Sequence, residues 1–375
     1  MKNKTAGIMT FHASHNNGSM LQAYALQKVL KEQFGLENEI INFSNKSQQR
    51  QYAILYMPYT LKQLIRNFLN LRFYSILKKR FNDYVDFSAK YLRVSENLID
   101  NDENLAKCEG NYDMLICGSD QIWNTKANDA DKAYFLSFAK NRKKIAYAVS
   151  FGATNINTVA NVEEYARYVN DFSAISVREY NAQKWLQEIT DIPIEITADP
   201  TLLLEKKDYL PLCSDSGIKE KYIFWYTITY KKETVKYITE VSKKLGLPIY
   251  VIDAKEWTRR NLSQYGIKLA PNGGPGSYLS CIKNADLVLT SSFHGTIFSV
   301  MFEKNFRYLK MSSNPNDDRA SFLLHQLNLS DRFTELNRLN KLDLEEMPNY
   351  DTVKDKIENL KEKSLFFLKS SITEK

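Results

Sequence analysis

The sequence predicts an α/β protein made of two doubly wound domains that face each other across a cleft. Apolar runs of strand length alternate along the chain with segments of helical periodicity, which is typical of parallel βα units. The chain has 375 residues, more than one hydrophobic core usually organises, so two domains are expected. Residues 205–220 are polar and lack a clear periodicity, and they are predicted to link two series of such units.

The amino-terminal domain is expected over residues 1–204. Its first strand is predicted at residues 5–11, "TAGIMTF", and a helix follows from Ser19, whose side-chain oxygen can accept hydrogen bonds from unpaired amides of the first turn. Further strands are predicted at residues 38–43, 112–120, 144–152, 172–179 and 193–204. Residues 48–92 interrupt the alternation. They are rich in aromatic, leucine and basic residues and are predicted to form a helical insertion.

The carboxyl-terminal domain is expected over residues 221–345. Its strands are predicted at residues 222–229, 248–253 and 286–291, with helical segments between and after them. The final segment, residues 346–375, is predicted to be one amphipathic helix. Open α/β sheets bind ligands beyond the carboxyl ends of their strands, so the cleft between the two sheets is the expected binding site.

The composition excludes some classes of protein. The net charge of +7 suits anionic small molecules, phosphorylated lipid carriers or a negative membrane surface. The sequence carries no helix-turn-helix, zinc-finger or RRM signature, so no nucleic-acid partner is expected. No apolar run reaches the length needed to span a bilayer, and the first residues lack the apolar core of a signal peptide. We therefore expect a cytoplasmic protein, at most peripheral at the inner face of the cell membrane.

Neither the cysteines nor the histidines predict a metal site. The four cysteines are scattered without a CxxC pair, and reduced, buried thiols are expected for Cys117 and Cys281. Only His12 and His15 are closely spaced, which is too few ligands for zinc. The turn "NGGPGS", residues 272–277, lacks the lysine of a phosphate-binding loop and is interpreted as a helix start.

A histidine stands between a predicted strand and a predicted helix in "SSFHGTIFSV", residues 291–300. His294 is expected to face the cleft at the amino end of that helix, where unpaired backbone amides favour a phosphate or carboxylate. Gly295 would let a ligand approach the backbone, and Thr296 can donate a hydroxyl. The ordinary pKa of histidine lies near neutrality, which suits proton transfer. The alternative is a histidine that is hydrogen-bonded inside a turn.

The stretch "NADLVLTSSFHGTIFSVMFEKNF" resembles the signature of the polysaccharide pyruvyl transferase family. The segments "NNGSMLQAYAL", "DMLICGSDQIWN" and "ISVRE" followed by "ADPTLLL" agree in the family's order, over residues 5–330. The resemblance implies two Rossmann-like domains in the GT-B arrangement. It also implies transfer of the enolpyruvyl group of phosphoenolpyruvate to two hydroxyls of a cell-surface or exopolysaccharide sugar, or of its lipid-linked precursor. The products are a pyruvate ketal and phosphate, and no separate cofactor is expected.

The sequence departs from the family pattern at Phe293, where better-studied members often carry an arginine directly before the histidine. Arg319, in "NPNDDRASFL", follows the next predicted strand and is the first candidate for a replacement cation. Lys310, in "YLKMSS", is the second candidate.

Three residues are expected to carry the chemistry. Arg178 ends a predicted strand and can grip a carboxylate or phosphate with two hydrogen bonds. A salt bridge with Glu179 or a neighbouring helix is an equal alternative on the residues alone, and the resemblance favours the functional role. His294 is expected to be the acid or a phosphate ligand, with Arg178 and Arg319 neutralising charge on the departing phosphate. Asp120 is the first choice for the base that accepts protons from the sugar hydroxyls. Capping of the following turn is its equal alternative.

Four further residues are candidates for contacts with the acceptor sugar or the phosphate. Asn17 and Gly18 lie in the first strand-to-helix turn, and Ser150 and Gly152 lie in "SFG" at the end of a later predicted strand. Trp123 can stack on a sugar ring, although a core position is the commoner place for such a tryptophan.

The aromatic and basic segment, residues 52–91, has two interpretations. In the first, its helices pack on the amino-terminal domain and shape the acceptor pocket. In the second, it contacts anionic lipid through basic residues that lie among leucines and aromatics. Those residues are Arg66, Arg72, Lys78, Lys79 and Arg80.

Two other functional classes stay open on the sequence. A glycosyltransferase of the same shape that uses a nucleotide sugar would need a carboxyl-terminal-domain glutamate for the ribose, and Glu303 is a weak candidate. A non-catalytic sugar-binding relative would keep the fold without the chemistry. The joint presence of Arg178 and His294 argues against this last class.

Overall fold

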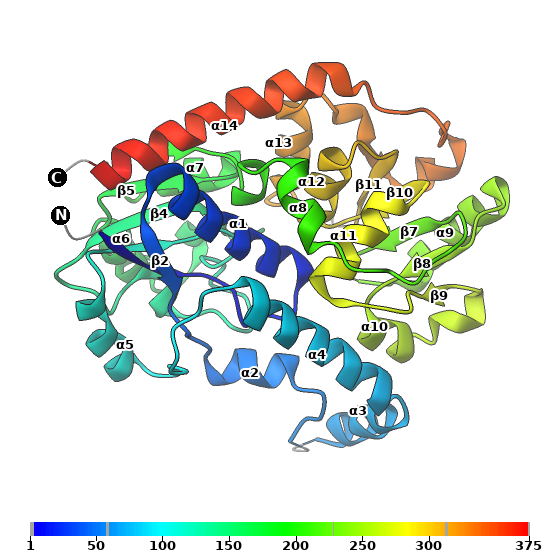
Figure 1. Cartoon of the computed structure of the whole chain (residues 1–375), viewed down its shortest axis with the longest axis horizontal. Helices are drawn as coiled ribbons and strands as arrows, with labels where there is room; N and C mark the ends of the chain where they lie inside the picture. The colour runs from blue at the N-terminus through cyan, green and yellow to red at the C-terminus, as the bar shows by residue number, and fades with distance from the viewer. Residues whose placement is uncertain (1–3, 58–59, 228, 312–313, 374–375) are drawn as a thin grey trace.

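The computed structural model describes residues 4–57, 60–227, 229–311 and 314–373 and contains two six-stranded sheets (Figure 1). The order of the amino-terminal sheet is β2-β1-β3-β4-β5-β6, and all its neighbours are parallel. Its strands are β1 (Thr5–Met9), β2 (Glu37–Ile40), β3 (Met114–Cys117), β4 (Lys143–Val149), β5 (Ala174–Val177) and β6 (Ile194–Ile196). The order reverses between β1 and β3, so the loops after these strands diverge and open a crevice.

The carboxyl-terminal sheet is also parallel throughout, in the order β12-β11-β10-β7-β8-β9. Its strands are β7 (Ile223–Tyr226), β8 (Ile249–Val251), β9 (Lys268–Leu269), β10 (Leu287–Thr290), β11 (Phe306–Lys310) and β12 (Phe333–Glu335). Here the order reverses between β7 and β10. The predicted fold class, two doubly wound α/β domains, is confirmed.

Sequence patterns explain which strands were predicted well. The central strands β3 and β10 are buried at every position, so they appear as unbroken apolar runs, as expected for parallel sheets covered on both faces. The short strands β9 and β12 lie at the two edges of their sheet and are partly exposed, so they carry no such run. The predicted strand at residues 222–229 ends at Tyr226, and its residue 228 lies outside the described ranges.

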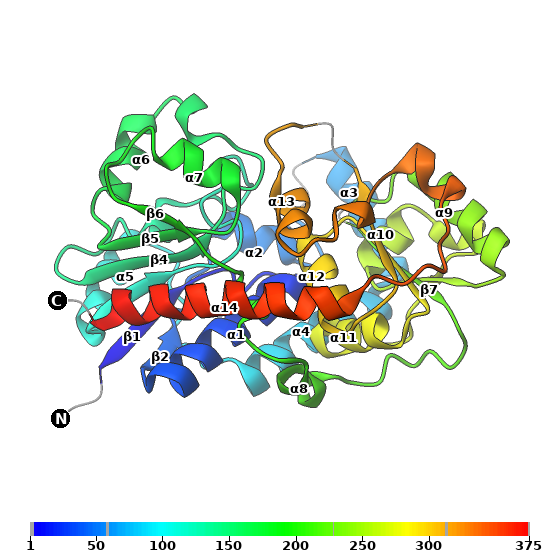
Figure 2. The ribbon, with the colours of Figure 1, turned by 90° about the horizontal axis from the view of Figure 1, so that it is seen from above.

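Helices pack on both faces of the sheets (Figures 1 and 2). They are α1 (Asn17–Phe34), α2 (Lys46–Tyr52), α3 (Leu61–Arg72), α4 (Tyr74–Tyr91), α5 (Asp102–Cys108), α6 (Val162–Val169), α7 (Tyr180–Leu186), α8 (Lys206–Tyr209), α9 (Lys232–Leu245), α10 (Ala254–Arg259), α11 (Gly274–Asn284), α12 (Phe293–Met301), α13 (Arg319–Gln326) and α14 (Tyr350–Thr373). Over the described ranges, none is long and apolar enough to cross a membrane.

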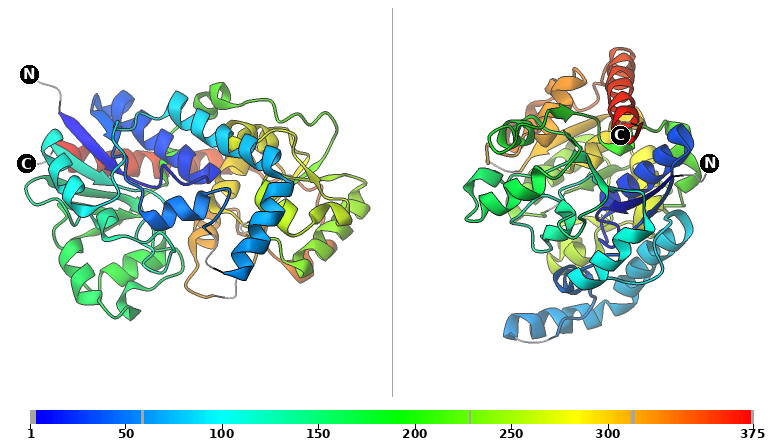
Figure 3. Two further views of the ribbon diagram at one scale, coloured as in Figure 1. Left: turned by 90° about the horizontal axis from the view of Figure 1, so that it is seen from below. Right: turned by 90° about the vertical axis from the view of Figure 1, so that its left-hand side faces the viewer.

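The helical insertion forms α2, α3 and α4, and it bridges both domains (Figure 3). Arg80 in α4 donates a hydrogen bond to the backbone oxygen of Ala270 in the carboxyl-terminal domain. From the carboxyl-terminal domain, Lys255 Nζ donates a hydrogen bond to the backbone oxygen of Ala53, which follows α2 in the insertion, at 3.0 Å. The insertion therefore belongs to the wall between the domains and does not pack on the amino-terminal domain alone.

Helix α14 runs back from the carboxyl-terminal domain along the amino-terminal one (Figure 2). At its start, Tyr350 donates a hydrogen bond to the backbone oxygen of Lys304, at 2.5 Å. Further along, Ser364 Oγ accepts a hydrogen bond from the backbone amide of Ala198, at 2.8 Å. The final helix was predicted over residues 346–375, and it starts four residues later, at Tyr350. Residues 374 and 375 lie outside the described ranges.

Leu368 of α14 is fully buried, whereas Phe366, two residues earlier, is 73% exposed. Leu368→Ala should lower the free energy of unfolding by about 2–5 kcal/mol, because it removes buried apolar surface and leaves a cavity. Phe366→Ala should change that free energy by less than about 0.5 kcal/mol. Chemical denaturation of the two variants measures both values, and equal effects would contradict the docking of α14.

Candidate active site

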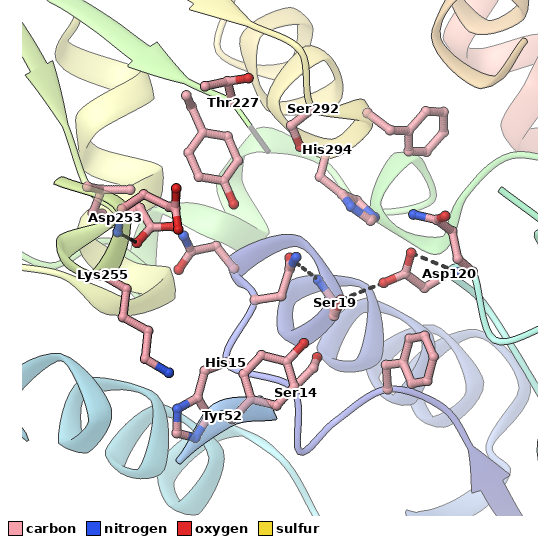
Figure 4. A pocket seen from close by; sticks show the side chains of 18 of the residues that line it. Ser14, His15, Ser19, Tyr52, Asp120, Thr227, Asp253, Lys255, Ser292 and His294 are labelled. Atoms are coloured by element: carbon pink, nitrogen blue, oxygen red, sulfur yellow. Dashed lines mark hydrogen bonds between the residues drawn. The ribbon is translucent and has the colours of Figure 1, made fainter. Parts of the chain in front are cut away.

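A cavity of about 490 Å³ lies between the carboxyl edges of the two sheets. Its lining comes from the loops after β1, β3 and β5, from the loops after β7, β8, β10 and β11, and from the insertion helices α2 and α4. These loops include those at both points of strand-order reversal, where open parallel sheets bind ligands. Figure 4 shows side chains of both domains pointing into this space.

One buried cluster joins residues of both domains at the cavity. His294 Nε2 lies 3.5 Å from Asp199 Oδ2, and Arg178 Nη1 lies 2.5 Å from the same oxygen. Arg178 Nη2 lies 3.2 Å from Asp120 Oδ1. Arg178, Asp120 and His294 line the cavity, while Asp199 lies behind them. The structure therefore brings the three residues that were expected to carry the chemistry to one place.

Asp199 is ionised at neutral pH. Burial alone would raise its pKa, but the charges of His294 and Arg178 hold the pKa of this carboxyl well below its ordinary value. Two hydroxyls also donate to it, Ser119 Oγ at 3.0 Å and Thr201 Oγ1 at 2.6 Å. This ionised carboxylate faces Nε2 of His294 at 3.5 Å.

Asp120 has little capacity left for a substrate. Burial works to raise its pKa, but Arg178, His294 and the hydroxyl of Ser19 lower it below the ordinary value. Oδ1 accepts hydrogen bonds from Arg178 and from the backbone amide of Gln121, and Oδ2 accepts one from Ser19 Oγ at 2.5 Å (Figure 4). Ser19 lines the cavity together with Asp120.

The predicted helix cap at Ser19 is wrong. Helix α1 begins at Asn17, and the side chain of Asn16 accepts hydrogen bonds from the amides of Gly18 and Ser19. Ser19 lies inside the first turn, so its hydroxyl is left for Asp120. Gly18 lies against His294, and a Cβ at this position would overlap the imidazole ring. Gly18 thus provides clearance between the domains, while Asn17 lines the cavity.

Gly295 and Thr296 are packing residues of α12. A Cβ on Gly295 would overlap the side chain of Thr290 in β10, and Thr296, fully buried, donates its hydroxyl to the backbone oxygen of Ser292 at 3.1 Å. Ser150 and Gly152 bond to each other, with the Gly152 amide donating to Ser150 Oγ at 3.0 Å. None of these four lines the cavity.

The two candidate replacement cations differ in position. Arg319 lines the cavity, held by Asp317 through bonds of 2.8 and 3.0 Å. Lys310 lies outside the lining, exposed and 3.5 Å from Glu335 Oε1, because it ends its strand on the solvent side. Phe293 lies with its ring 4.3 Å from Arg178 Cζ, a cation–π contact, so it covers the guanidinium instead of adding a cation.

Trp123, a candidate for stacking on a sugar ring, and Glu303, a candidate for binding a nucleotide ribose, both lie away from the cavity. Trp123 is fully buried, stacks on Phe135 at 4.7 Å between ring centroids and is a core residue. Glu303 is a surface residue within ion-pair distance of Lys206 and Lys354. Neither lines the cavity.

Neither Asp199 nor Lys255 was predicted as a site residue from the sequence. Asp199 lies in "ADPTLLL", directly before a proline, and this position is the only signal that the sequence gives for it. Lys255 follows β8 and points into the cavity (Figure 4), where it donates to backbone oxygens. Among the residues that the structure describes, no carboxylate forms an ion pair with it.

His15 lies at the same end of the cavity as Lys255, among aromatic rings. Its ring stacks on Tyr84 at 5.0 Å and meets Phe81 edge-on at 4.5 Å. Burial, with a smaller contribution from Lys255, lowers the pKa of His15 to about 4, so this imidazole is neutral at pH 7. In the described part of the chain, no group of three or more His, Cys, Asp or Glu side chains could hold a metal ion.

Two doubly wound domains with a polar cavity between their carboxyl edges define a GT-B-type enzyme. A family model described as "Polysaccharide pyruvyl transferase" matches residues 16–313. The chain therefore belongs to the polysaccharide pyruvyl transferase family, and it is a transferase that acts on a donor and a saccharide acceptor. No curated protein matches the sequence at a significant level.

Solved structures resemble this chain in fold. A putative UDP-N-acetylglucosamine 2-epimerase from Listeria monocytogenes aligns with a TM-score of 0.56 and 10% identity, over 100% of this chain and 98% of that one. The UDP-GlcNAc 2-epimerase from Neisseria meningitidis, bound to UDP-GlcNAc, aligns with a TM-score of 0.51 and 9% identity, over 97% and 99%. At these identities the likeness shows the GT-B fold alone.

Glu179, next to Arg178, should give the protein a measurable pH dependence. Burial outweighs the charge of Arg178 and raises the pKa of this carboxyl to about 7, from an ordinary 4.5. Between these pH values the folded state holds a proton that the unfolded state has lost. The free energy of unfolding should therefore fall as pH rises through this window, by about 3 kcal/mol.

Denaturation of wild type and Glu179→Gln across this range isolates the contribution of Glu179. The variant cannot ionise, so its stability should lack this decline. Parallel pH profiles for the two proteins would contradict the raised pKa.

Proposed function

We propose that this protein transfers the enolpyruvyl group of phosphoenolpyruvate to a sugar of a cell-surface polysaccharide or exopolysaccharide, or of its lipid-linked precursor. The product is a cyclic pyruvate ketal, and phosphate is released. The observation that carries the proposal is the His294–Asp199 pair at the wall of a cavity lined by both domains. The proposal includes no cofactor beyond the donor, and it assumes a cytoplasmic location, peripheral to the membrane.

In the proposed reaction, the imidazolium of His294 donates a proton to the methylene carbon of phosphoenolpyruvate. C2 then becomes electrophilic, and one sugar hydroxyl adds to it. The second hydroxyl adds to C2 as the bond between C2 and the phosphate oxygen breaks. One of the two hydroxyl protons returns to His294, which gave its own proton to the new methyl group. The other hydroxyl proton leaves with phosphate. Asp199 supports this cycle because it stabilises the charged imidazole.

Arg178 acts as a positioning residue in this proposal. Its guanidinium is already paired with Asp199 and Asp120, so it offers no net charge to an anionic donor. It holds both carboxylates in place, and Asp120 with Ser19 would orient a sugar hydroxyl.

Lys255 is the cation we assign to the donor phosphate. It lines the cavity, and its bonds to the backbone oxygens of Gln51 and Ala53 leave its charge without a carboxylate partner among the described residues. Arg319 is the candidate that we assign to the donor carboxylate. Its guanidinium already forms an ion pair with Asp317.

The insertion helices supply a wall suited to a sugar ring. Tyr52 and Tyr84 line the cavity together with His15, whose ring centroid lies 5.5 Å from that of Tyr52. Aromatic faces and polar edges of this kind favour the apolar faces and hydroxyls of a saccharide. We therefore place the acceptor on this side.

Replacement of His294 tests the acid. His294→Ala should lower phosphate release from phosphoenolpyruvate, with acceptor present, by about 10²–10⁴-fold, because the proton donor is lost. His325→Ala changes an exposed histidine of α13 and should leave turnover unchanged. A His294 variant that stays folded and keeps full activity would remove this residue from the mechanism.

Thermal unfolding with added ligands tests the donor. Phosphoenolpyruvate at about a hundred times its Kd should stabilise the protein by about 2.7 kcal/mol. Lys255→Ala should lose most of this gain, whereas Lys268→Ala, at an exposed lysine paired with Glu220, should keep it. Stabilisation by a UDP-sugar and not by phosphoenolpyruvate would instead favour a nucleotide-sugar glycosyltransferase.

A further inference from the structure

Helix α3 exposes an apolar face to solvent. Five of its large apolar side chains are each more than half exposed: Leu61, Leu64, Ile65, Phe68 and Leu71. At 100° per residue they fall within an arc of about 120°, so they form one continuous stripe along the helix. We call this stripe the α3 face.

The polar side of α3 points into the protein. Asn67 Nδ2 donates to the backbone oxygen of Tyr56 at 2.7 Å, and its Oδ1 accepts from the Tyr56 amide at 2.8 Å. Asn70, 1% exposed, donates to the backbone oxygen of Ile54 at 2.6 Å. A helix that rests on a protein in water normally has the opposite orientation, with apolar residues inward. The inverted orientation is typical of a helix whose apolar face contacts another apolar surface, so a partner that suits the α3 face is expected.

The charge around α3 distinguishes between the possible partners of the α3 face. Residues 40–82 contain eight lysines and arginines and no aspartate or glutamate. Arg72, Lys78 and Lys79 are exposed, whereas Arg80 turns inward to the carbonyl of Ala270. A second copy of the chain docked on this face would bring like charges together, while an anionic lipid surface is complementary to it.

We propose that α3 is an interfacial helix that inserts its apolar face into an anionic membrane surface. Its 12 residues are too few to cross a bilayer, so the helix would lie in the plane of the interface with the basic residues at the head groups. The apolar face provides the main attraction, and the basic residues add a salt-dependent part. Because α2 and α4 of the same insertion line the cavity, docking would bring the cavity close to a lipid-borne acceptor.

Flotation with vesicles tests this proposal without any use of the enzymatic reaction. Wild type should bind vesicles of phosphatidylcholine and phosphatidylglycerol more tightly than vesicles of phosphatidylcholine alone. Leu64→Ser/Phe68→Ser should weaken this binding by about tenfold or more, because two inserted side chains are lost. Phe366→Ser is the matched control, since Phe366 and Phe68 are both 73% exposed, and it should bind like wild type. High salt should weaken the binding without abolishing it.

The proposal is overturned if wild type does not bind anionic vesicles, or if the double variant binds them as tightly as wild type. A wild-type dimer that becomes a monomer in the double variant, without lipid binding by either, would show that a second copy covers the face. Phosphate release with a soluble acceptor should be the same in wild type and double variant. Failure of this proposal is therefore distinct from failure of the proposed chemistry.

Discussion

One buried carboxylate connects the two halves of this protein at the cavity. Asp199 follows the last strand of the amino-terminal sheet and contacts both a cation of its own domain, Arg178, and the imidazole of the facing domain, His294. Removal of one member of a buried ionic group leaves an unpaired charge and typically costs about 3–5 kcal/mol. The contact with His294 also depends on Gly18, since any side chain there would overlap the imidazole. The contact between the two domains at this point and the orientation of His294 thus depend on the same residues.

The same pairing decides how charge is distributed along the cavity. Arg178 lies between carboxylates and under the ring of Phe293, so its positive charge is largely balanced where it lies. Lys255, beside the insertion helices, has no carboxylate as an ion-pair partner among the residues that the structure describes.

The insertion of α2, α3 and α4 contributes to two different surfaces of the protein. Its inner side contributes aromatic rings to the cavity wall, and its outer side presents the α3 face. The GT-B fold is shared with enzymes that act on nucleotide sugars, so the fold by itself does not select the chemistry. The family match is what favours pyruvyl transfer over glycosyl transfer here.

The sequence alone determined the fold class, because central strands of parallel sheets are buried on both faces and appear as apolar runs such as those of β3 and β10. It also located Arg178 and His294, because strand ends in such sheets meet at one edge. Only the tertiary structure decided the partners of those residues. Asp199 and His294 are 95 residues apart, and local periodicity says which positions are apolar but not which charged groups meet. For the same reason the position of Lys255 in the cavity and the outward orientation of the α3 face became visible only in the folded chain.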